Sequence, residues 1–154
     1  MTLAFSKVAV IGAGAMGRGI AQIAAQAGSQ VWLFDAQPGA TTKAREALAQ
    51  QWDKLLEKGK LTAEAVAGHK ARLHEASSLQ DLAGCELVVE AIVEKIDIKK
   101  AVFADLEKVV AADAVLVTNT SSLSVTAIAA GMQHPGRFAG YHFFNPVPLM
   151  KVVE

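Results

Sequence analysis

The residues with the clearest chemical purpose are three glycines and an aspartate near the start of the chain. Gly12, Gly14 and Gly17 follow the apolar run 7–11, and Asp35 stands 18 residues after Gly17, where a second apolar run ends. A glycine-rich turn between a strand and a helix places backbone N–H groups and the positive end of the helix dipole against an anion. This spacing, with an acid that closes the second strand, is typical of a dinucleotide site.

Each glycine of this motif has its own physical reason. Gly12 permits the tight turn out of the strand, Gly14 removes the Cβ that would keep the backbone from a pyrophosphate, and Gly17 lets the helix pack close to the sheet. The other residues of the expected cofactor turn are Ala13, Ala15 and Met16. The glycines alone are a weak signal, but here the strand, helix, second strand and acid all stand at the expected offsets.

Asp35 indicates which dinucleotide is bound. Its carboxylate can accept hydrogen bonds from both hydroxyls of the adenosine ribose, and it would repel the additional phosphate of NADP. We therefore expect NAD. Arg18 leaves an alternative open, because a cation near the phosphates would favour NADP, whereas a solvated surface charge would not.

Further polar residues follow the apolar runs in the second half of the chain. They are Glu90, Glu94, the segment 119–122 (Asn-Thr-Ser-Ser) and the segment 142–146 (His-Phe-Phe-Asn-Pro). Ligands of an open parallel sheet bind beyond the carboxyl ends of its strands. We therefore expect these side chains to converge on one edge of the sheet.

The alternation of apolar runs with amphipathic stretches predicts an α/β fold of the Rossmann type, with a doubly wound, mainly parallel sheet and helices on both faces. The expected strands are 7–11, 31–34, 71–74, 87–89, 114–117 and 138–141, in the spatial order 3-2-1-4-5-6. The expected helices run from the glycine turn to about residue 27 and over 42–58, 61–68 and 96–111. Thr41 or Thr42 is expected to cap the second helix.

Helical periodicity also predicts which side chains face the core. For the helix 42–58 these are Ala44, Leu48, Trp52, Leu55 and Leu56. For the helix 96–111 they are Ile98, Val102, Leu106 and Val109.

The composition favours a single packed domain that does not bind nucleic acid. The 154 residues are 52% hydrophobic and 19% charged, with 15 basic and 15 acidic side chains. No basic cluster interleaved with aromatic residues is present to grip a phosphate backbone. The single Cys85, the lack of an apolar segment of the ~18 residues that a bilayer requires, and the lack of a secretion signal predict a cytoplasmic protein without membrane contact. His69, His74 and His134 do not have the spacing of a metal site.

Four segments of the chain resemble one known family. They are 12–21 (GAGAMGRGIA), 88–94 (VVEAIVE), 119–123 (NTSSL) and 137–154 (RFAGYHFFNPVPLMKVVE). Together they are similar to the NAD-binding domain of the L-3-hydroxyacyl-CoA dehydrogenases, and the resemblance covers essentially the whole chain. It implies oxidation of a (3S)-3-hydroxyacyl-CoA to the 3-ketoacyl-CoA, with hydride passing from C3 to the nicotinamide.

The resemblance also implies roles for individual residues. His142 is the expected general base, Glu154 its carboxylate partner, and Ser121 the hydroxyl that contacts the substrate oxygen and the cofactor. Further cofactor contacts implied in this way are Glu94, Lys99 and Asn145. The residue types suit the reaction, because a secondary alcohol gives up hydride readily only as its O–H proton leaves for a base.

Other interpretations of these residues remain open. His142, beside two phenylalanines, can be a hydrogen-bonded core residue, and Glu154 can be a solvated chain end. Residues 119–122 can cap the short helix that follows, and Asn119 is expected to be a structural cap of its turn.

The helix 42–58 corresponds to the part of the family that meets coenzyme A. Lys58, with Lys54 and Lys60, is a candidate contact to its phosphates, and a solvated helix exterior is the alternative. The region 41–73 is similar to bacterial members that act on short-chain or dicarboxylic esters, including 3-hydroxybutyryl-CoA and the 3-hydroxyadipyl-CoA of phenylacetate breakdown.

Residues 1–154 are expected to form the NAD-binding domain alone. Residues 149–154 are predicted to be a further strand that stops without a turn, so we expect the natural protein to continue. The resemblance implies a helical second domain that closes the cleft over the acyl chain and forms most of a homodimer interface. We therefore expect this chain to bind NAD with little turnover.

Two alternatives to this function are open. The first is a nucleotide-binding or structural module without dehydrogenase chemistry. The second is a 2-hydroxyacid or 6-phosphogluconate-type dehydrogenase, which shares the glycine motif but does not explain the HFFNP block.

Overall fold

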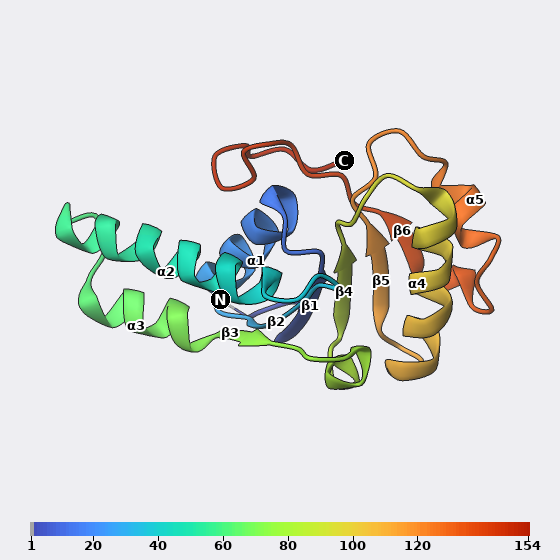
Figure 1. Ribbon diagram of the computed structural model, residues 1–154, viewed down its shortest axis with the longest axis horizontal. Helices are drawn as coiled ribbons and strands as arrows, with labels where there is room; N and C mark the ends of the chain where they lie inside the picture. The colour runs from blue at the N-terminus through green and yellow to red at the C-terminus, as the bar shows by residue number, and fades with distance from the viewer. Residues whose placement is uncertain (1) are drawn as a thin grey trace.

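The computed structural model describes residues 2–154 and contains one six-stranded sheet (Figure 1). Its strands are β1 (Lys7–Ile11), β2 (Gln30–Phe34), β3 (Leu73–Glu75), β4 (Leu87–Glu90), β5 (Val115–Thr118) and β6 (Phe138–Gly140). They lie in the order β3-β2-β1-β4-β5-β6, and every neighbouring pair is parallel. The predicted strand order is confirmed, and the predicted strand ends differ by no more than two residues.

Helices cover both faces of this sheet. They are α1 (Ala15–Ala27), α2 (Ala40–Glu57), α3 (Ala63–Ala71), α4 (Ile96–Val109) and α5 (Val125–Ala129), with two 3-10 helices, η1 (Leu79–Leu82) and η2 (Pro135–Arg137). Because successive strand residues face opposite sides, β1 contributes to two cores. Val8 and Val10 pack with residues of α1 and α2, whereas Ala9 and Ile11 pack with residues of α4 and α5. The fold is the predicted doubly wound α/β fold.

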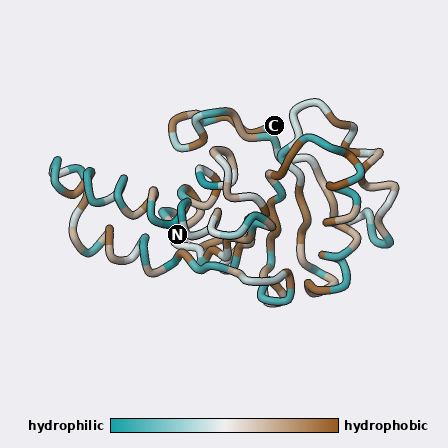
Figure 2. The backbone as a smooth tube through the Cα atoms, viewed as in Figure 1, coloured by the Kyte–Doolittle hydropathy of each residue, from teal (hydrophilic) through white to brown (hydrophobic). Residues whose placement is uncertain are grey.

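The distribution of apolar residues agrees with this layering. Figure 2 shows apolar residues along β4 and β5 and hydrophilic residues on the outer turns of α2. None of the helices within residues 2–154 combines the length and apolar character that crossing a membrane requires.

The glycine turn between β1 and α1 is as tight as the sequence predicts. Gly12 has a φ of 104°, and a Cβ there would lie 2.5 Å from the carbonyl oxygen of Ala91. A Cβ on Gly17 would collide with the carbonyl oxygen of Gly12, so the helix can approach the strand only without a side chain there. The helix ends at Gly28, in the left-handed conformation expected of a C-terminal stop.

α2 and α3 form an arm that extends away from the sheet (Figure 1). The predicted cap of α2 is wrong, because the chain enters the helix through Gly39, which has a φ of 78°. Thr41 and Thr42 therefore lie inside the first turn. Their hydroxyls donate to the carboxylate of Glu75 at 3.0 and 2.8 Å and tie the helix to the end of β3.

The other caps explain where the shorter helices begin. α3 starts later than predicted, because the hydroxyl of Thr62 accepts a hydrogen bond from the N–H of Ala65 at 3.1 Å and caps the helix. The helix also ends later than predicted, at Ala71. α5 is capped by Ser124, whose hydroxyl accepts from the N–H of Ala127. Residues 119–122 are therefore not the cap of this helix, contrary to the simpler interpretation of that segment.

The predicted inner face of α4 is confirmed at Leu106, with Val102 and Val109 partly buried against the same core, and it is wrong at Ile98. The buried residues of this helix are Lys99, Phe103 and Leu106, whereas Ile98 is 42% exposed. The pattern misleads because a lysine is normally counted as facing water. Here Lys99 faces inward to pair with Glu90, and Ile98 is turned toward the carboxyl edge of the sheet.

The strand predicted at residues 149–154 is also absent from the structure. The N–H of Leu149 donates to the carbonyl oxygen of Pro146 at 3.0 Å, and the turn reverses the chain. The returning segment makes one isolated antiparallel bridge, between Phe143 and Val153, and adds no strand to the sheet.

The glycine turn gives a direct test of this packing. Gly17→Ala should lower the free energy of unfolding by about 2 kcal/mol or more, because the helix must move off the strand. Gly14→Ala should change it by about 1 kcal/mol or less, because nothing lies within 4 Å of a Cβ there. Urea unfolding followed by circular dichroism measures both, and equal stabilities of the two variants would contradict the packing described.

Candidate active site

A cavity of about 640 Å³ opens at the carboxyl ends of β1, β2 and β4. Its lining includes Gly12, Gly14, Arg18, Asp35, Ile92 and Ile98. β1 and β4 are the neighbours at which the strand order reverses, which is where doubly wound sheets bind their ligands. The structure therefore brings the glycine motif and the predicted ribose acid together in one hollow.

Asp35 holds the glycine turn as well as facing the cavity. One carboxylate oxygen accepts from the N–H of Ala13 and the other from the N–H of Gln37, both at 2.8 Å. A carboxylate oxygen can accept more than one hydrogen bond, so both retain capacity for ribose hydroxyls.

The space around Gly14 fits the phosphates of a dinucleotide. No atom lies within 4 Å of the position of a Cβ on Gly14, at the N-terminal end of α1. The first turn of this helix carries no acidic side chain to compete for its N–H groups. Arg18 is exposed at the rim of the same cavity.

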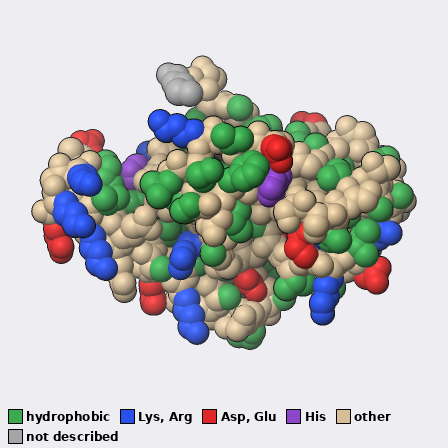
Figure 3. All heavy atoms as spheres, turned by 90° about the horizontal axis from the view of Figure 1, so that it is seen from above, with side chains coloured by type: hydrophobic (Ala, Val, Ile, Leu, Met, Phe, Trp, Pro, Cys, Tyr) green, Lys and Arg blue, Asp and Glu red, His purple; other side chains and the backbone are tan. Residues whose placement is uncertain are grey.

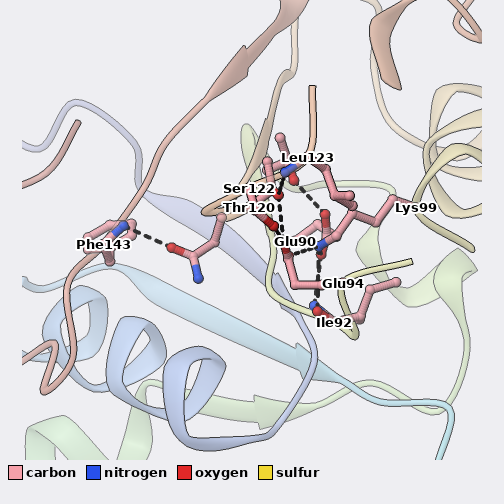
Figure 4. Close-up of polar contacts among 10 residues, drawn as sticks. Glu90, Ile92, Glu94, Lys99, Thr120, Ser122, Leu123 and Phe143 are labelled. Atoms are coloured by element: carbon pink, nitrogen blue, oxygen red, sulfur yellow. Dashed lines mark hydrogen bonds and ion pairs between the residues drawn. The ribbon is translucent and has the colours of Figure 1, made fainter. Parts of the chain in front are cut away.

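A second polar cluster lies beyond β4 and β5 (Figure 4). At its centre Glu90 and Lys99 are both fully buried, with 2.5 Å between the ammonium and one carboxylate oxygen. That oxygen also accepts from the N–H of Ile92, and the other accepts from the hydroxyl of Thr118. Both oxygens of Glu90 are therefore occupied by groups of the protein.

Glu94 joins this cluster to the loop after β5. Its carboxylate lies 3.2 Å from the ammonium of Lys99 and accepts from the hydroxyls of Thr120 and Ser122 at 2.7 and 3.3 Å. Partial burial opposes ionisation, but the bonds from Thr120 and Lys99 outweigh it and hold the pKa of Glu94 below its usual range. Glu94 is 40% exposed, whereas Lys99 lies behind it with no exposed surface.

His142 and Glu154 form the third part of the site. The Nδ1 atom of His142 lies 3.1 Å from a carboxylate oxygen of Glu154, and the backbones of the two residues exchange hydrogen bonds at 2.8 and 2.9 Å. The His142 side chain is 25% exposed, so it is not enclosed in the core. Glu154 is 69% exposed, so its carboxylate is largely solvated while it pairs with His142.

Two contacts fix the segment that carries His142. The side-chain oxygen of Asn119 accepts from the N–H of Phe143 at 2.8 Å (Figure 4). Val147 is buried against α1, where a Cβ on Gly19 would lie 2.9 Å from its own Cβ. Asn119 thus links the loop after β5 to the segment that follows β6, a role that its prediction as a simple turn cap missed. The residues are 24 apart, and no local pattern joins them.

The other predicted site residues, Ser121, Asn145 and Lys58, are all exposed, but they lie in different parts of the fold. Ser121 is exposed in the loop after β5, between the two residues bonded to Glu94. Asn145 is exposed in the turn that follows Phe144. Lys58 lies at the exposed outer end of α2 and does not line the cavity.

Comparison with known proteins supports one family. Residues 7–154 match the family model described as 3-hydroxyacyl-CoA dehydrogenase, NAD binding domain. The chain is 46% identical to the 3-hydroxyadipyl-CoA dehydrogenase of Escherichia coli over all 154 residues, and 47% identical to a probable 3-hydroxybutyryl-CoA dehydrogenase of Deinococcus radiodurans over 150 residues. These alignments cover 100% and 96% of this chain, and 32% and 53% of the two relatives.

Solved structures agree with this assignment. A crystal structure of 3-hydroxybutyryl-CoA dehydrogenase from Escherichia coli superposes with a TM-score of 0.95 at 46% identity, over 98% of this chain and 32% of that one. The (S)-3-hydroxybutyryl-CoA dehydrogenase PaaH1 from Ralstonia eutropha superposes with a TM-score of 0.92 at 37% identity, over 97% of this chain and 53% of that one. The chain spans about a third to a half of the length of these relatives. It belongs to the NAD-binding domain family of the 3-hydroxyacyl-CoA dehydrogenases.

Proposed function

We propose that the complete protein oxidises a (3S)-3-hydroxyacyl-CoA to the 3-ketoacyl-CoA, and that residues 1–154 are its NAD-binding domain. The observation that carries the proposal is the pairing of His142 with Glu154 at the carboxyl edge of a sheet that also presents the glycine turn. A base and its orienting acid have no use in a module that only binds a nucleotide.

In this proposal His142 removes the proton of the substrate hydroxyl. An Nδ1–H that donates to Glu154 leaves Nε2 with its lone pair, free to accept that proton. The carboxylate also stabilises the imidazolium that forms. NAD, when bound, supplies the acceptor for the hydride that leaves C3.

Ser121 is proposed to bind the substrate oxygen during this change. A hydroxyl can donate to and accept from an oxygen that begins as an alcohol and ends as a carbonyl. Gly12–Gly17, Asp35, Glu94 and Asn145 are proposed to bind the cofactor. Lys99 was expected to contact it too, but its side chain has no exposed surface, so it is proposed instead to support Glu94 from behind.

The substrate class follows from the relatives' names. Two of them are named for 3-hydroxyadipyl-CoA and 3-hydroxybutyryl-CoA, so we propose a short-chain or dicarboxylic acyl group here. Lys58, with Lys54 and Lys60, is proposed to meet the phosphates of coenzyme A. Relative kcat/KM values of the complete protein for these esters and a long-chain ester measure this preference.

The proposal includes a helical second domain, a homodimer and a cytoplasmic location. Hydrophobic side chains gather on the face that carries the C-terminal segment (Figure 3). Exposed residues of that region include Tyr141, Leu149, Met150, Val152 and Val153. A second domain that closes over the site would cover such a surface and exclude water from the reaction.

The assignment of Asp35 predicts cofactor preference. Calorimetric titration should show NAD binding about tenfold or more tightly than NADP, because the carboxylate repels the additional phosphate. Asp35→Asn should weaken NAD binding and reduce the difference between the affinities for NAD and NADP. Asp105→Asn, which removes a charge from an exposed pair on α4, is the matched control and should leave both affinities unchanged. A wild-type chain that prefers NADP would show that Arg18 sets the specificity instead.

The role of His142 predicts a separation of catalysis from binding. In the complete protein, His142→Gln should lower kcat by about 100-fold or more, as expected for the loss of a general base. Affinity for NAD, measured by titration, should stay within about threefold. Loss of NAD binding together with activity would assign the histidine a structural role and favour a module without dehydrogenase chemistry.

The proposed second domain predicts that the chain of residues 1–154 alone is a poor catalyst. With NADH and acetoacetyl-CoA it should bind the cofactor, but its turnover should be about 100-fold or more below that of the complete protein, because substrate positioning and water exclusion are lost. A steady-state absorbance assay compares the two. Equal turnover would show that residues 1–154 contain everything the reaction requires.

A further inference from the structure

The buried pair of Glu90 and Lys99 has no direct contact with the reacting groups of the proposed reaction. Neither side chain has exposed surface, so neither can touch a substrate in this structure. Burying two charges is expensive even when they pair, and apolar residues of similar size often stabilise a core better. We therefore expect this pair to have a role in addition to packing.

Glu90 is held from three elements. The hydroxyl of Thr118 donates to one carboxylate oxygen from the end of β5, at 2.7 Å. The N–H of Ile92 donates to the other at 2.8 Å, from the loop that leads to α4, and Lys99 reaches the same oxygen from α4 itself. The carboxylate thus fixes where Lys99 can place its ammonium.

Lys99 connects Glu90 to the loop after β5 through Glu94. Its ammonium lies 3.2 Å from one carboxylate oxygen of Glu94, and the other oxygen of Glu94 accepts from Thr120 and Ser122. These two residues are the neighbours of Ser121 on either side. Thr120 also accepts from the N–H of Leu123 at 3.0 Å, which closes the loop (Figure 4).

We propose that Glu90 and Lys99 are positioning residues that set the place of Ser121 through Glu94 and the hydroxyls on either side of the serine. The inference rests on the proposed function of Ser121. It explains why a lysine lies inside the helix face that periodicity reserves for apolar residues. A purely structural pair would stabilise the fold without acting on the serine.

The test uses the complete protein with both charges removed together, as Glu90→Gln with Lys99→Met, so that no unpaired charge is left in the core. The matched control removes the exposed pair of the same helix, as Asp105→Asn with Lys108→Met. The buried double variant should lower kcat by about 10- to 100-fold, the size expected from a small misplacement of a reacting group. The control should leave kcat within about twofold.

A double-mutant cycle with Ser121→Ala distinguishes positioning from general damage. If the pair acts through the serine, its removal in the Ser121→Ala background should change kcat by no more than about twofold. An equally large loss in both backgrounds, an unchanged kcat in the folded double variant, or full activity of Ser121→Ala would each overturn the proposal.

A variant in the loop covers the case in which the double variant does not fold. Thr120→Val keeps the shape but removes the hydroxyl, so it should lower kcat by about tenfold or more, and Thr120→Ser should restore most of it. If Thr120→Ser does not restore kcat, or if Thr120→Val keeps wild-type activity, the proposal is overturned.

Amide hydrogen exchange gives a readout that does not depend on turnover. The N–H of Leu123 should exchange about tenfold or more faster in the buried double variant or in Thr120→Val than in the parent. Unchanged exchange would overturn the proposal. If the parent protein shows no 3-hydroxyacyl-CoA turnover, the proposed function fails, and the exchange rates alone decide whether this pair orders the loop.

Discussion

The common direction of the six strands is the constraint on which the site depends. In a parallel sheet every strand delivers its carboxyl end to the same edge, so residues far apart in sequence meet there. Asp35 follows β2, Glu90 ends β4, Asn119 follows β5, and His142 comes shortly after β6. The glycine turn after β1 completes this edge, and the space beside Gly14 is open, with no atom within 4 Å of where a Cβ would lie.

The loops at this edge are held by side-chain acceptors rather than by regular structure. Irregular backbone leaves N–H groups that need partners. Asp35 accepts from Ala13, Glu90 from Ile92, and Asn119 from Phe143. Polar side chains therefore fix the loops that form the site, and Asp35 also faces the cavity, whereas Glu90 is fully buried and serves only to hold the loops around it.

Much of the fold could be predicted because local patterns determine it. The glycine spacing, the acid 18 residues later and the alternating apolar runs gave the strand order and the cofactor turn. The inward position of Lys99 could not be predicted, because periodicity treats a lysine as solvated and its partner Glu90 lies on another element. The bond from Phe143 to Asn119 was not predicted for a related reason, since it joins the segment after β6 to the loop after β5. The pairing of His142 with Glu154 was expected only from family resemblance, and no periodicity indicates it.

We propose that His142, oriented by Glu154, faces the oxygen on C3 of a substrate bound beside NAD. A crystal structure of the complete protein with NAD and acetoacetyl-CoA is the decisive test of this arrangement. We expect Nε2 of His142 to lie about 3 Å from the C3 oxygen of the ligand, within hydrogen-bond reach, while Nδ1 keeps its bond to Glu154. A C3 oxygen that lies beyond the reach of His142, or against a different base, would contradict it.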